Sequence, residues 1–472
     1  MVFSSTLFLL CYLPLTLLGY YLIREKYRNI FLLIVSLLFF AWSQPHYLWI
    51  IVLNILVNYT GAMLISKTDV KLWRKIGIVC TVAANLAILF YFKYFNFAVD
   101  SFNRIFDSNI DIVGVILPIG ISFFTFQGLS YAIDVYREKV AVQKNPLKVA
   151  LYIVLFPQLI AGPIVRYIDV EREINHRSVS LDDFAAGIQR FIIGLAKKAI
   201  LANTLAVTAD SIWNAGVDQN TVAIAWVGSI AYSLQIFFDF SGYSDMAIGL
   251  GRMFGFHFLE NFRLPYISKS IREFWRRWHI SLSSWFRDYV YIPLGGNRKH
   301  VYLNLAIVFL LTGIWHGAAW QFILWGLVHG FFMLLERGLA QRGVNLGWMP
   351  APLKTVLSHV YTLFVVNAAW ILFRAPGTRA AVDYFGTMFG VGLGSNPGVN
   401  VWWYLDDWTI FIMIVAIIFA TALPTKIGEV LTGKLNDKVL QTMKYVCLIG
   451  LLLFSMLRIV SGTYNPFIYF QF

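Results

Sequence analysis

The sequence predicts an all-α protein that crosses a membrane many times, and three observations predict it. Of the 472 residues, 58% are hydrophobic and only 13% are charged, about half the charged share of ordinary globular domains. Mean hydropathy is +0.66. Apolar runs that approach the roughly 20 residues needed to cross a bilayer recur along the whole chain. These features exclude a soluble fold.

About eleven spans are expected in a single integral-membrane domain, 1–472. The ranges are 5–23, 30–42, 46–65, 76–92, 112–133, 146–165, 221–241, 301–335, 353–373, 408–423 and 441–460. A further segment, 185–206, is amphipathic, with Lys197 and Lys198 inside an apolar frame.

The region 301–335 is uncharged over 35 residues. A straight helix of that length would measure about 52 Å, which exceeds a hydrocarbon core of roughly 30 Å. The region must therefore tilt, bend or turn back. Its glycines are the expected bend points, namely Gly313, Gly317, Gly326 and Gly330.

Charge predicts the orientation of the first half. The loops 24–28 and 67–75 are basic, and the loop 43–46 between them carries no charge. Since Lys and Arg accumulate in cytoplasmic loops, the N-terminus is expected outside, on an uncleaved first helix. The same bias explains the net charge of +13, so no nucleic-acid partner is expected.

The stretch 252–299 has no clean span. It holds nine Lys or Arg against three acidic residues, together with Trp275, Trp278 and Trp285. A basic, Trp-rich stretch is expected to lie on the membrane or to dip into it as broken helices. Irregular backbone at that depth is tolerated only inside protein or along a cavity.

Two histidines, His279 and His316, lie where water should be scarce. An ionisable group at membrane depth is a functional candidate by default, and imidazole moves protons near neutral pH. The structural alternative is a hydrogen bond to a neighbouring helix. His329 is almost half a turn out of phase with His316 on one helix, which favours packing. The other histidines, in or near loops, are expected to be solvated.

No metal site, permanent cofactor or disulfide is expected. The three cysteines lie far apart in apolar segments without CxxC spacing. Gly-rich nucleotide loops and GxSxG are absent from the sequence.

The stretch 261–298, with Thr312-Gly-Ile-Trp-His-Gly-Ala-Ala-Trp320, closely resembles the membrane-bound O-acyltransferase family. Within it, the chain is similar to the branch that O-acetylates alginate-like exopolysaccharides or cell-wall polymers. The resemblance covers essentially the whole chain, and neither histidine motif departs from it. Further matches are the opening 1–5 and the segments 91–97, 117–123, 161–166, 238–249 and 464–470.

The resemblance implies a ring of tilted helices, with re-entrant or interfacial helices, around a central tunnel, and a catalytic core at roughly 230–335. It also implies that His316 is the catalytic histidine. His279 matches a second position, which is Asn, Asp or His across the family. Imidazole is a good general base for acyl transfer, contributing about 10²–10⁴-fold. We therefore expect His316 to act as the base, and His279 to orient it or to polarise the thioester carbonyl.

The donor is expected to be acetyl-CoA or another acyl thioester. Arg272, Trp275, Arg276 and Arg277 are the expected donor-binding residues, because guanidinium pairs well with phosphate. An equally weighted alternative is that these arginines only meet lipid headgroups. Locally, Asp288 is expected to pair with Arg287. A structural role is favoured for Asp239 and Asp245, which flank the segment 241–244.

The expected function is transfer of an acetyl group from a cytoplasmic donor toward an extracytoplasmic polysaccharide, either alginate-like or peptidoglycan. The expected location is the bacterial cytoplasmic (inner) membrane, with several passes through the bilayer. A separate periplasmic or extracellular acetyltransferase is the expected partner. Alternatives are D-alanyl transfer to teichoic acid, a histidine-gated transporter or flippase, and a scaffold for polysaccharide export.

Overall fold

The computed structural model describes residues 1–160, 162–216, 219–344, 349–392, 399–462, 464, 465 and 468. Ala161 and part of the closing motif 464–470 lie outside the described residues. Within the described part every regular element is a helix, as expected. Two compact units interleave along the chain, Met1–Phe191 with Tyr243–Leu259 and Ile192–Gly242 with Glu260–Phe472. We call them unit 1 and unit 2, and the single domain stays a prediction.

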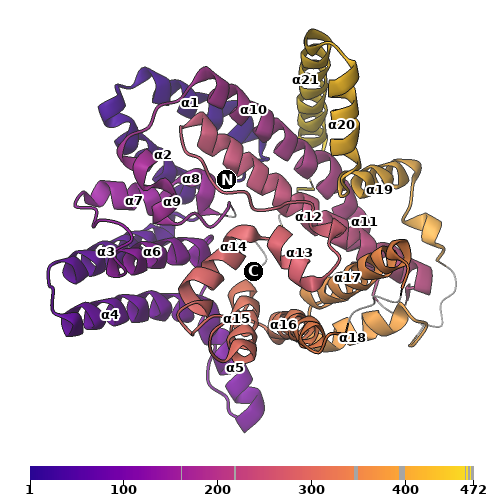
Figure 1. The fold of residues 1–472 in the computed structure, drawn as a ribbon, viewed down its shortest axis with the longest axis horizontal. Helices are drawn as coiled ribbons and strands as arrows, with labels where there is room; N and C mark the ends of the chain where they lie inside the picture. The colour runs from indigo at the N-terminus through magenta and orange to yellow at the C-terminus, as the bar shows by residue number, and fades with distance from the viewer. Residues whose placement is uncertain are drawn as a thin grey trace. The chain divides into compact units, whose positions relative to one another are not determined.

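Unit 1 contains the first nine helices (Figure 1). They are α1 (Leu13–Leu22), α2 (Arg28–Ser43), α3 (Leu48–Ser66), α4 (Lys71–Leu89), α5 (Phe95–Phe106), α6 (Ile121–Tyr136), α7 (Pro146–Val154), α8 (Phe156–Leu159) and α9 (Tyr167–Asn175). Helices α3, α4 and α6 pack on one another. Three buried amides, Asn54, Asn58 and Asn85, hydrogen-bond between α3 and α4 at 2.8–3.0 Å, as polar groups do between helices in lipid.

Two expected spans in unit 1 are wrong as single helices, and proline explains both. The span 146–165 is broken at Leu155, since Pro157 lies in the first turn of a new helix, α8. The span 112–133 begins only at Ile121, after Pro118 and after Gly120, whose φ is +76°. The residue before a proline is pushed toward extended backbone, so Leu117 does not lead into the helix.

Two long helical segments have residues in both units. The first runs from α10 (Leu181–Ala196) through a π-helical turn (Lys197–Ala202) into α11 (Asn203–Ala215), and the second is α12 (Val222–Met253). The remaining helices belong to unit 2: α13 (Ile271–Arg277), α14 (Ile280–Phe286), α15 (Val301–His316), α16 (Trp320–Gln341), α17 (Ala351–Arg374), α18 (Thr378–Thr387), α19 (Asp407–Phe419), α20 (Leu423–Lys434) and α21 (Asp437–Ser461).

The region 301–335 turns back on itself, which is one of the three expected possibilities, a tilt, a bend or a turn. The turn lies between α15 and α16, which pack closely on each other. Of the four glycines, only Gly317 lies in the break, so the expectation of bends at the other three is wrong. Gly313 and Gly326 instead permit close approach: a Cβ on Gly326 would lie 2.4 Å from the Phe309 carbonyl oxygen.

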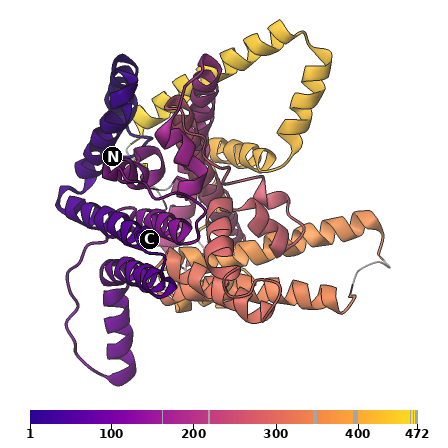
Figure 2. The ribbon, with the colours of Figure 1, turned by 60° about the vertical axis from the view of Figure 1, so that its left-hand side comes forward.

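Eight helices of the described residues are long and apolar enough to cross a membrane. The pair α19 and α20, bent by 71°, makes nine if it is one span (Figure 2). Of the expected eleven, the span 5–23 corresponds to a shorter apolar helix, Phe8–Leu22, and the spans 112–133 and 146–165 are not among the candidates. Leu181–Ala215, part of which was expected only as an amphipathic segment, is a candidate. The protein is an all-α, multi-pass membrane protein. The stretch 252–299 is broken as predicted, because α13 and α14 have only seven residues each.

Candidate active site

His279 lies at the junction of α13 and α14, where Asn261 holds it. Its backbone is left-handed, with φ at +45°. The backbone carbonyl of Asn261 accepts the N–H of Ile280 at 3.0 Å. The side-chain Oδ1 of Asn261 accepts the backbone N–H and the hydroxyl of Ser281, at 3.2 and 2.9 Å. One asparagine therefore pins the junction through both its main chain and its side chain.

Asn261 also determines which nitrogen of His279 carries the proton. The Nδ1 of His279 lies 3.1 Å from Asn261 Oδ1. Because that oxygen also accepts a backbone N–H, it cannot be the amide nitrogen, and it can only accept. The proton of the neutral ring is therefore on Nδ1, and the lone pair is on Nε2. The imidazole is fully buried, which disfavours its charged form.

His316 is the last residue of α15, and it lies beside His279. The two ring centroids are 6.3 Å apart. Aromatic rings surround His316 edge-on, with Trp325 at 4.8 Å, Trp315 at 5.0 Å and Phe373 at 5.3 Å. Its exposed fraction is only 3%. Both predicted histidines are thus buried in one aromatic cluster of unit 2.

His329 lies in the same cluster but on a different helix from His316, so the phase comparison on one helix does not apply. Trp325 contacts both imidazoles, with centroids 4.8 Å from His316 and 4.9 Å from His329. The ring of His329 is parallel to Phe274 at 6.0 Å. Neither of its nitrogens has a hydrogen-bond partner among the described residues. Its observed contacts are those of packing.

A basic cavity of about 950 Å³ opens beside this cluster in unit 2. Three of the four expected donor-binding residues line it, namely Arg272, Trp275 and Arg276. The two arginines are exposed and lie four residues apart on α13, which places them on one helix face. Lys269, Arg287 and Arg337 add positive charge, and Glu336 is the one acidic residue among the described lining.

Aromatic contacts connect the wall of the cavity with His316. Trp275 lines the cavity, and its ring centroid is 5.7 Å from that of Trp325, which in turn contacts His316. Phe309 lines the cavity as well and packs on Trp275 at 5.4 Å. One aromatic ring, Trp325, therefore separates the lining residue Trp275 from the candidate base.

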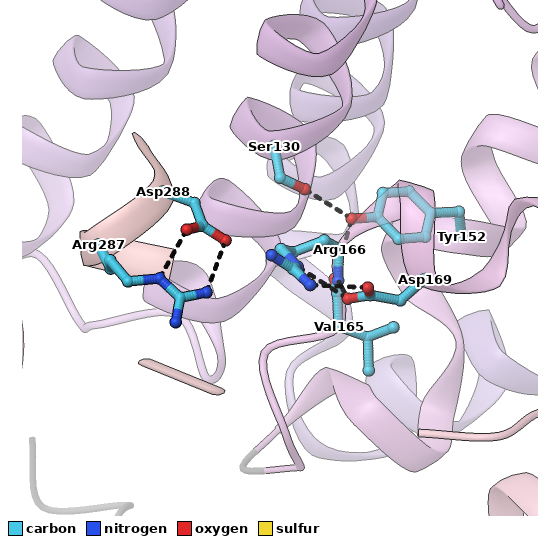
Figure 3. A network of polar contacts seen from close by, with 7 residues as sticks. All are labelled: Ser130, Tyr152, Val165, Arg166, Asp169, Arg287 and Asp288. Atoms are coloured by element: carbon cyan, nitrogen blue, oxygen red, sulfur yellow. Dashed lines mark hydrogen bonds and ion pairs between the residues drawn. The ribbon is translucent and has the colours of Figure 1, made fainter. Parts of the chain in front are cut away.

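Arg277 differs from the other expected donor-binding residues. Its guanidinium pairs with Glu273 at 2.8 Å and donates to the Arg263 carbonyl at 3.1 Å. It is outside the described lining of the cavity. The expected local pair is present: Arg287 binds Asp288 through two hydrogen bonds, 2.8 and 3.2 Å long (Figure 3).

The structural role favoured for Asp239 and Asp245 agrees with their contacts. Asp239 pairs with Lys198 at 2.7 Å, and both side chains are 2% exposed. Asp245 pairs with Arg190 at 2.6 Å. Both pairs join neighbouring helical segments. The sequence shows Lys198 only as a charged residue within an amphipathic segment, and the structure gives it a partner.

Sequence reasoning missed several polar contacts of unit 1. Tyr152 is fully buried, and its hydroxyl lies 2.8 Å from Ser130 Oγ and donates to the Val165 carbonyl at 2.9 Å (Figure 3). The next residue, Arg166, pairs with Asp169 at 2.8 Å. Buried hydroxyls within apolar runs have no sequence signature, so only the fold reveals them.

The model of the membrane-bound O-acyltransferase family matches residues 36–360. The chain is 40% identical to the probable alginate O-acetylase AlgI of Pseudomonas putida, with both chains covered in full. It is 35% identical to the peptidoglycan O-acetyltransferase of Helicobacter pylori over 83% of this chain and 80% of that one. The teichoic acid D-alanyltransferase of Bacillus subtilis is 32% identical over 54% of this chain and 68% of its own.

Proposed function

The chain belongs to the membrane-bound O-acyltransferase family and is an O-acyltransferase, and we propose that it moves an acetyl group from a cytoplasmic thioester toward an extracytoplasmic polysaccharide. The single observation that carries this proposal is the pairing of His279 and His316, 6.3 Å apart, next to a basic cavity. The proposed location is the bacterial inner membrane.

His316 is the proposed general base. The acceptor hydroxyl gives its proton to the imidazole while its oxygen attacks the thioester carbonyl carbon. The carbon–sulfur bond then breaks, and the departing thiolate takes up the proton. A positioned base of this kind contributes about 10²–10⁴-fold.

His279 is the proposed orienting partner. A group that polarises the thioester carbonyl must donate a hydrogen bond. Because the Nδ1–H of His279 donates its hydrogen bond to Asn261 Oδ1, the neutral ring has only a lone pair to offer at Nε2. The hydrogen-bond network thus supports the orienting role over the carbonyl-polarising role.

Arg272, Arg276 and Trp275 are proposed to bind the donor. Neither arginine pairs with a carboxylate through its side chain among the described residues, whereas Arg277 does. Such guanidinium groups suit the phosphates of coenzyme A. The cavity volume, about 950 Å³, is within the usual range for ligand sites.

The proposed acceptor is a sugar hydroxyl of an alginate-like polysaccharide or of peptidoglycan, reached with a partner acetyltransferase. The full-length relative from Pseudomonas putida is named for alginate, which favours acetyl over D-alanyl as the transferred group. The relative named for D-alanyl transfer matches only 54% of this chain.

Membranes that contain the protein should transfer labelled acetyl from acetyl-CoA, and His316→Ala should abolish this transfer while the protein still folds. His46→Ala is the matched control, because His46 is exposed and is expected to leave the rate unchanged. Retention of the wild-type rate by purified, folded His316→Ala would contradict the mechanism. Labelled D-alanyl carrier protein, tested in parallel, distinguishes the alternative donor.

A further inference from the structure

A second polar cavity, in unit 1, carries uncompensated positive charge. Its volume is about 470 Å³. Lys26, Arg28 and Arg177 line it, with the polar side chains of Asn29, Asn175 and Ser178. Glu25 is the one acidic residue in the described lining. It reaches Arg28 only at 3.4 Å, with a side chain that is 83% exposed, so this pair neutralises little charge.

Arg177 is held in place entirely by neutral oxygens. Its Nε donates to the Tyr20 hydroxyl at 2.9 Å and to the Phe254 carbonyl at 3.1 Å. Its Nη1 donates to Asn29 Oδ1 at 2.5 Å and to the Glu173 backbone carbonyl at 3.2 Å. The guanidinium is therefore fixed in position while its charge is not balanced by any of these contacts.

The nearest acidic side chain in sequence is already engaged elsewhere. Both carboxylate oxygens of Glu173 contact His257, one at its ring Nδ1, 2.7 Å away, and one at its backbone N–H, 3.1 Å away. Glu173 thus offers Arg177 a carbonyl but not a carboxylate.

The two guanidinium groups also lie against the same aromatic ring. Arg28 and Arg177 both lie within 6 Å of the Tyr20 ring centroid, at 5.0 and 5.6 Å. No carboxylate among these contacts balances the charge of Arg177. Fixed guanidinium donors are the groups that proteins use to bind phosphate oxygens.

We propose that this cavity binds a phosphate group, most suitably that of an anionic phospholipid. The loop 24–28 is expected on the cytoplasmic side, where anionic lipids concentrate, and basic pockets between helices on that side bind such headgroups. A soluble phosphate would satisfy the same groups, so the experiment separates the two sources.

The test uses native mass spectrometry of the purified, delipidated full-length protein. Phosphatidylglycerol, cardiolipin and phosphatidylcholine are added in turn to wild type and to the double variant Lys26→Gln/Arg28→Gln. We expect the variant to bind the two anionic lipids at least about 10-fold more weakly, because each basic group near the surface contributes to anionic-lipid binding.

The matched control is Lys67→Gln/Lys71→Gln. It removes two exposed lysines from another basic stretch, 67–75. Neither lysine is among the residues described as lining the cavity. The control should keep wild-type lipid binding. Equal loss in both double variants, or no loss in either, would overturn the assignment to a lipid headgroup. If Lys26→Gln/Arg28→Gln unfolds, Lys26→Gln alone serves, because that side chain is exposed.

A second arm measures the thermal midpoint in inorganic phosphate. If phosphate raises the midpoint of wild type but not of Lys26→Gln/Arg28→Gln, and no lipid binds selectively, the ligand is a soluble phosphate. Selective binding of the anionic lipids identifies a lipid headgroup. Failure of both arms to depend on Lys26 and Arg28 means that the cavity binds no phosphate.

Discussion

Asn261 shows how a single amide can define the chemistry of a neighbouring histidine. Its side-chain oxygen collects three donors, from His279 and from the backbone and side chain of Ser281. With the proton held on Nδ1, His279 can accept a hydrogen bond at Nε2 but cannot donate one there while it is neutral. The role of the second histidine therefore depends on a residue 18 positions before it in the sequence.

Removal of this oxygen should impair transfer. In Asn261→Ala the proton of His279 is free to occupy either nitrogen, and we expect the rate of acetyl transfer to fall by about 10²-fold. The rate is measured with labelled acetyl-CoA on protein that elutes as a folded species. Asn261→Ala with the rate of wild type would show that the tautomer does not matter.

Asn261→Asp separates the role of the oxygen from that of the amide. It keeps the acceptor but adds a negative charge beside His279, which favours the protonated ring. The unprotonated form of His279 is then reached only at higher pH. The acidic limb of the pH–rate profile should therefore shift to higher pH. A purely structural role of Asn261 would leave the position of that limb unchanged.

The two histidines could be found in the sequence, because an ionisable group stands out within apolar or membrane-embedded surroundings. Asn261 could not, since an asparagine in a basic loop has no comparable signal and lies 18 residues from His279. His257 is exposed, as expected, but its contacts with Glu173 at 2.7 Å and Asp183 at 3.4 Å could not be found in the sequence. Contacts between residues distant in sequence depend on the fold.

At the scale of elements, the hairpin of α15 and α16 depends on glycines that permit contact between the two backbones. A methyl group on Gly326 would meet the Phe309 carbonyl at 2.4 Å, which is far too close. We expect Gly326→Ala to destabilise the protein by about 1–3 kcal/mol, the usual cost of overpacking. The measurement is the midpoint of unfolding in a denaturing detergent.

Gly338 is the matched control on the same helix. A Cβ there would meet only the Tyr302 hydroxyl, at 3.8 Å. Gly338→Ala should be neutral or slightly stabilising, because alanine is the better helix former. Equal destabilisation by the two substitutions would show that close packing of α15 and α16 is not the cause.

The segment after α12 is tied to α9 and α10 of unit 1 through His257. Burial alone would lower the pKa of His257, but its hydrogen bonds to Glu173 and Asp183 outweigh that effect and raise the pKa above its usual value. A raised pKa means that the contribution to stability is complete below the unfolded-state pKa, about 6.5. The contribution is lost as pH rises through the folded-state value.

His257→Gln should therefore lower the thermal midpoint more at pH 6 than at pH 8.5. The measurement compares wild type with His257→Gln at both pH values, above the range in which exposed carboxylates titrate. His46→Gln, at an exposed histidine, controls for the loss of a solvated imidazole. A difference that is the same at both pH values would exclude a charge-dependent contact.

Helices whose bounds are set by hydropathy could be predicted from the sequence. Helix ends and breaks that are set by local backbone conformation could not. The apolar runs gave α3 and α17 nearly at their observed bounds. The breaks at Leu155 and at 317–319 depend on proline, on glycine and on the packing of neighbouring helices, which a hydropathy window averages away.

At the scale of the molecule, one buried ion pair connects parts of the chain far apart in sequence. Lys198 and Asp239 are both 2% exposed, and Asp239 also accepts the backbone N–H of Ile468 at 2.9 Å. Removing one partner of a buried pair leaves an uncompensated charge and costs about 3–5 kcal/mol. We expect Lys198→Met to lose that much stability in a detergent unfolding titration.

The double variant Lys198→Met/Asp239→Asn should regain most of the loss, because it removes the charge and keeps an oxygen for the N–H of Ile468. If the double variant is as unstable as Lys198→Met, the cost arises from packing and not from charge.

Composition was sufficient for the class of the whole molecule, since the charged share of 13% is about half that of ordinary globular domains. The number of spans was not predictable to better than two. Long helices such as Val222–Met253 exceed a bilayer, and short ones such as Val301–His316 fall below the usual length. Length alone does not decide which of these cross.

The φ of +45° at His279 restricts which residue types can occupy this position. Branched and bulky side chains are genuine outliers in that conformation, whereas Asn, Asp and His adopt it several-fold more often than other residues that carry a Cβ. These are the three residues that the family resemblance implies for this position. Among residues that carry a Cβ, the backbone conformation at this turn therefore favours side chains that form hydrogen bonds, independently of any requirement of catalysis.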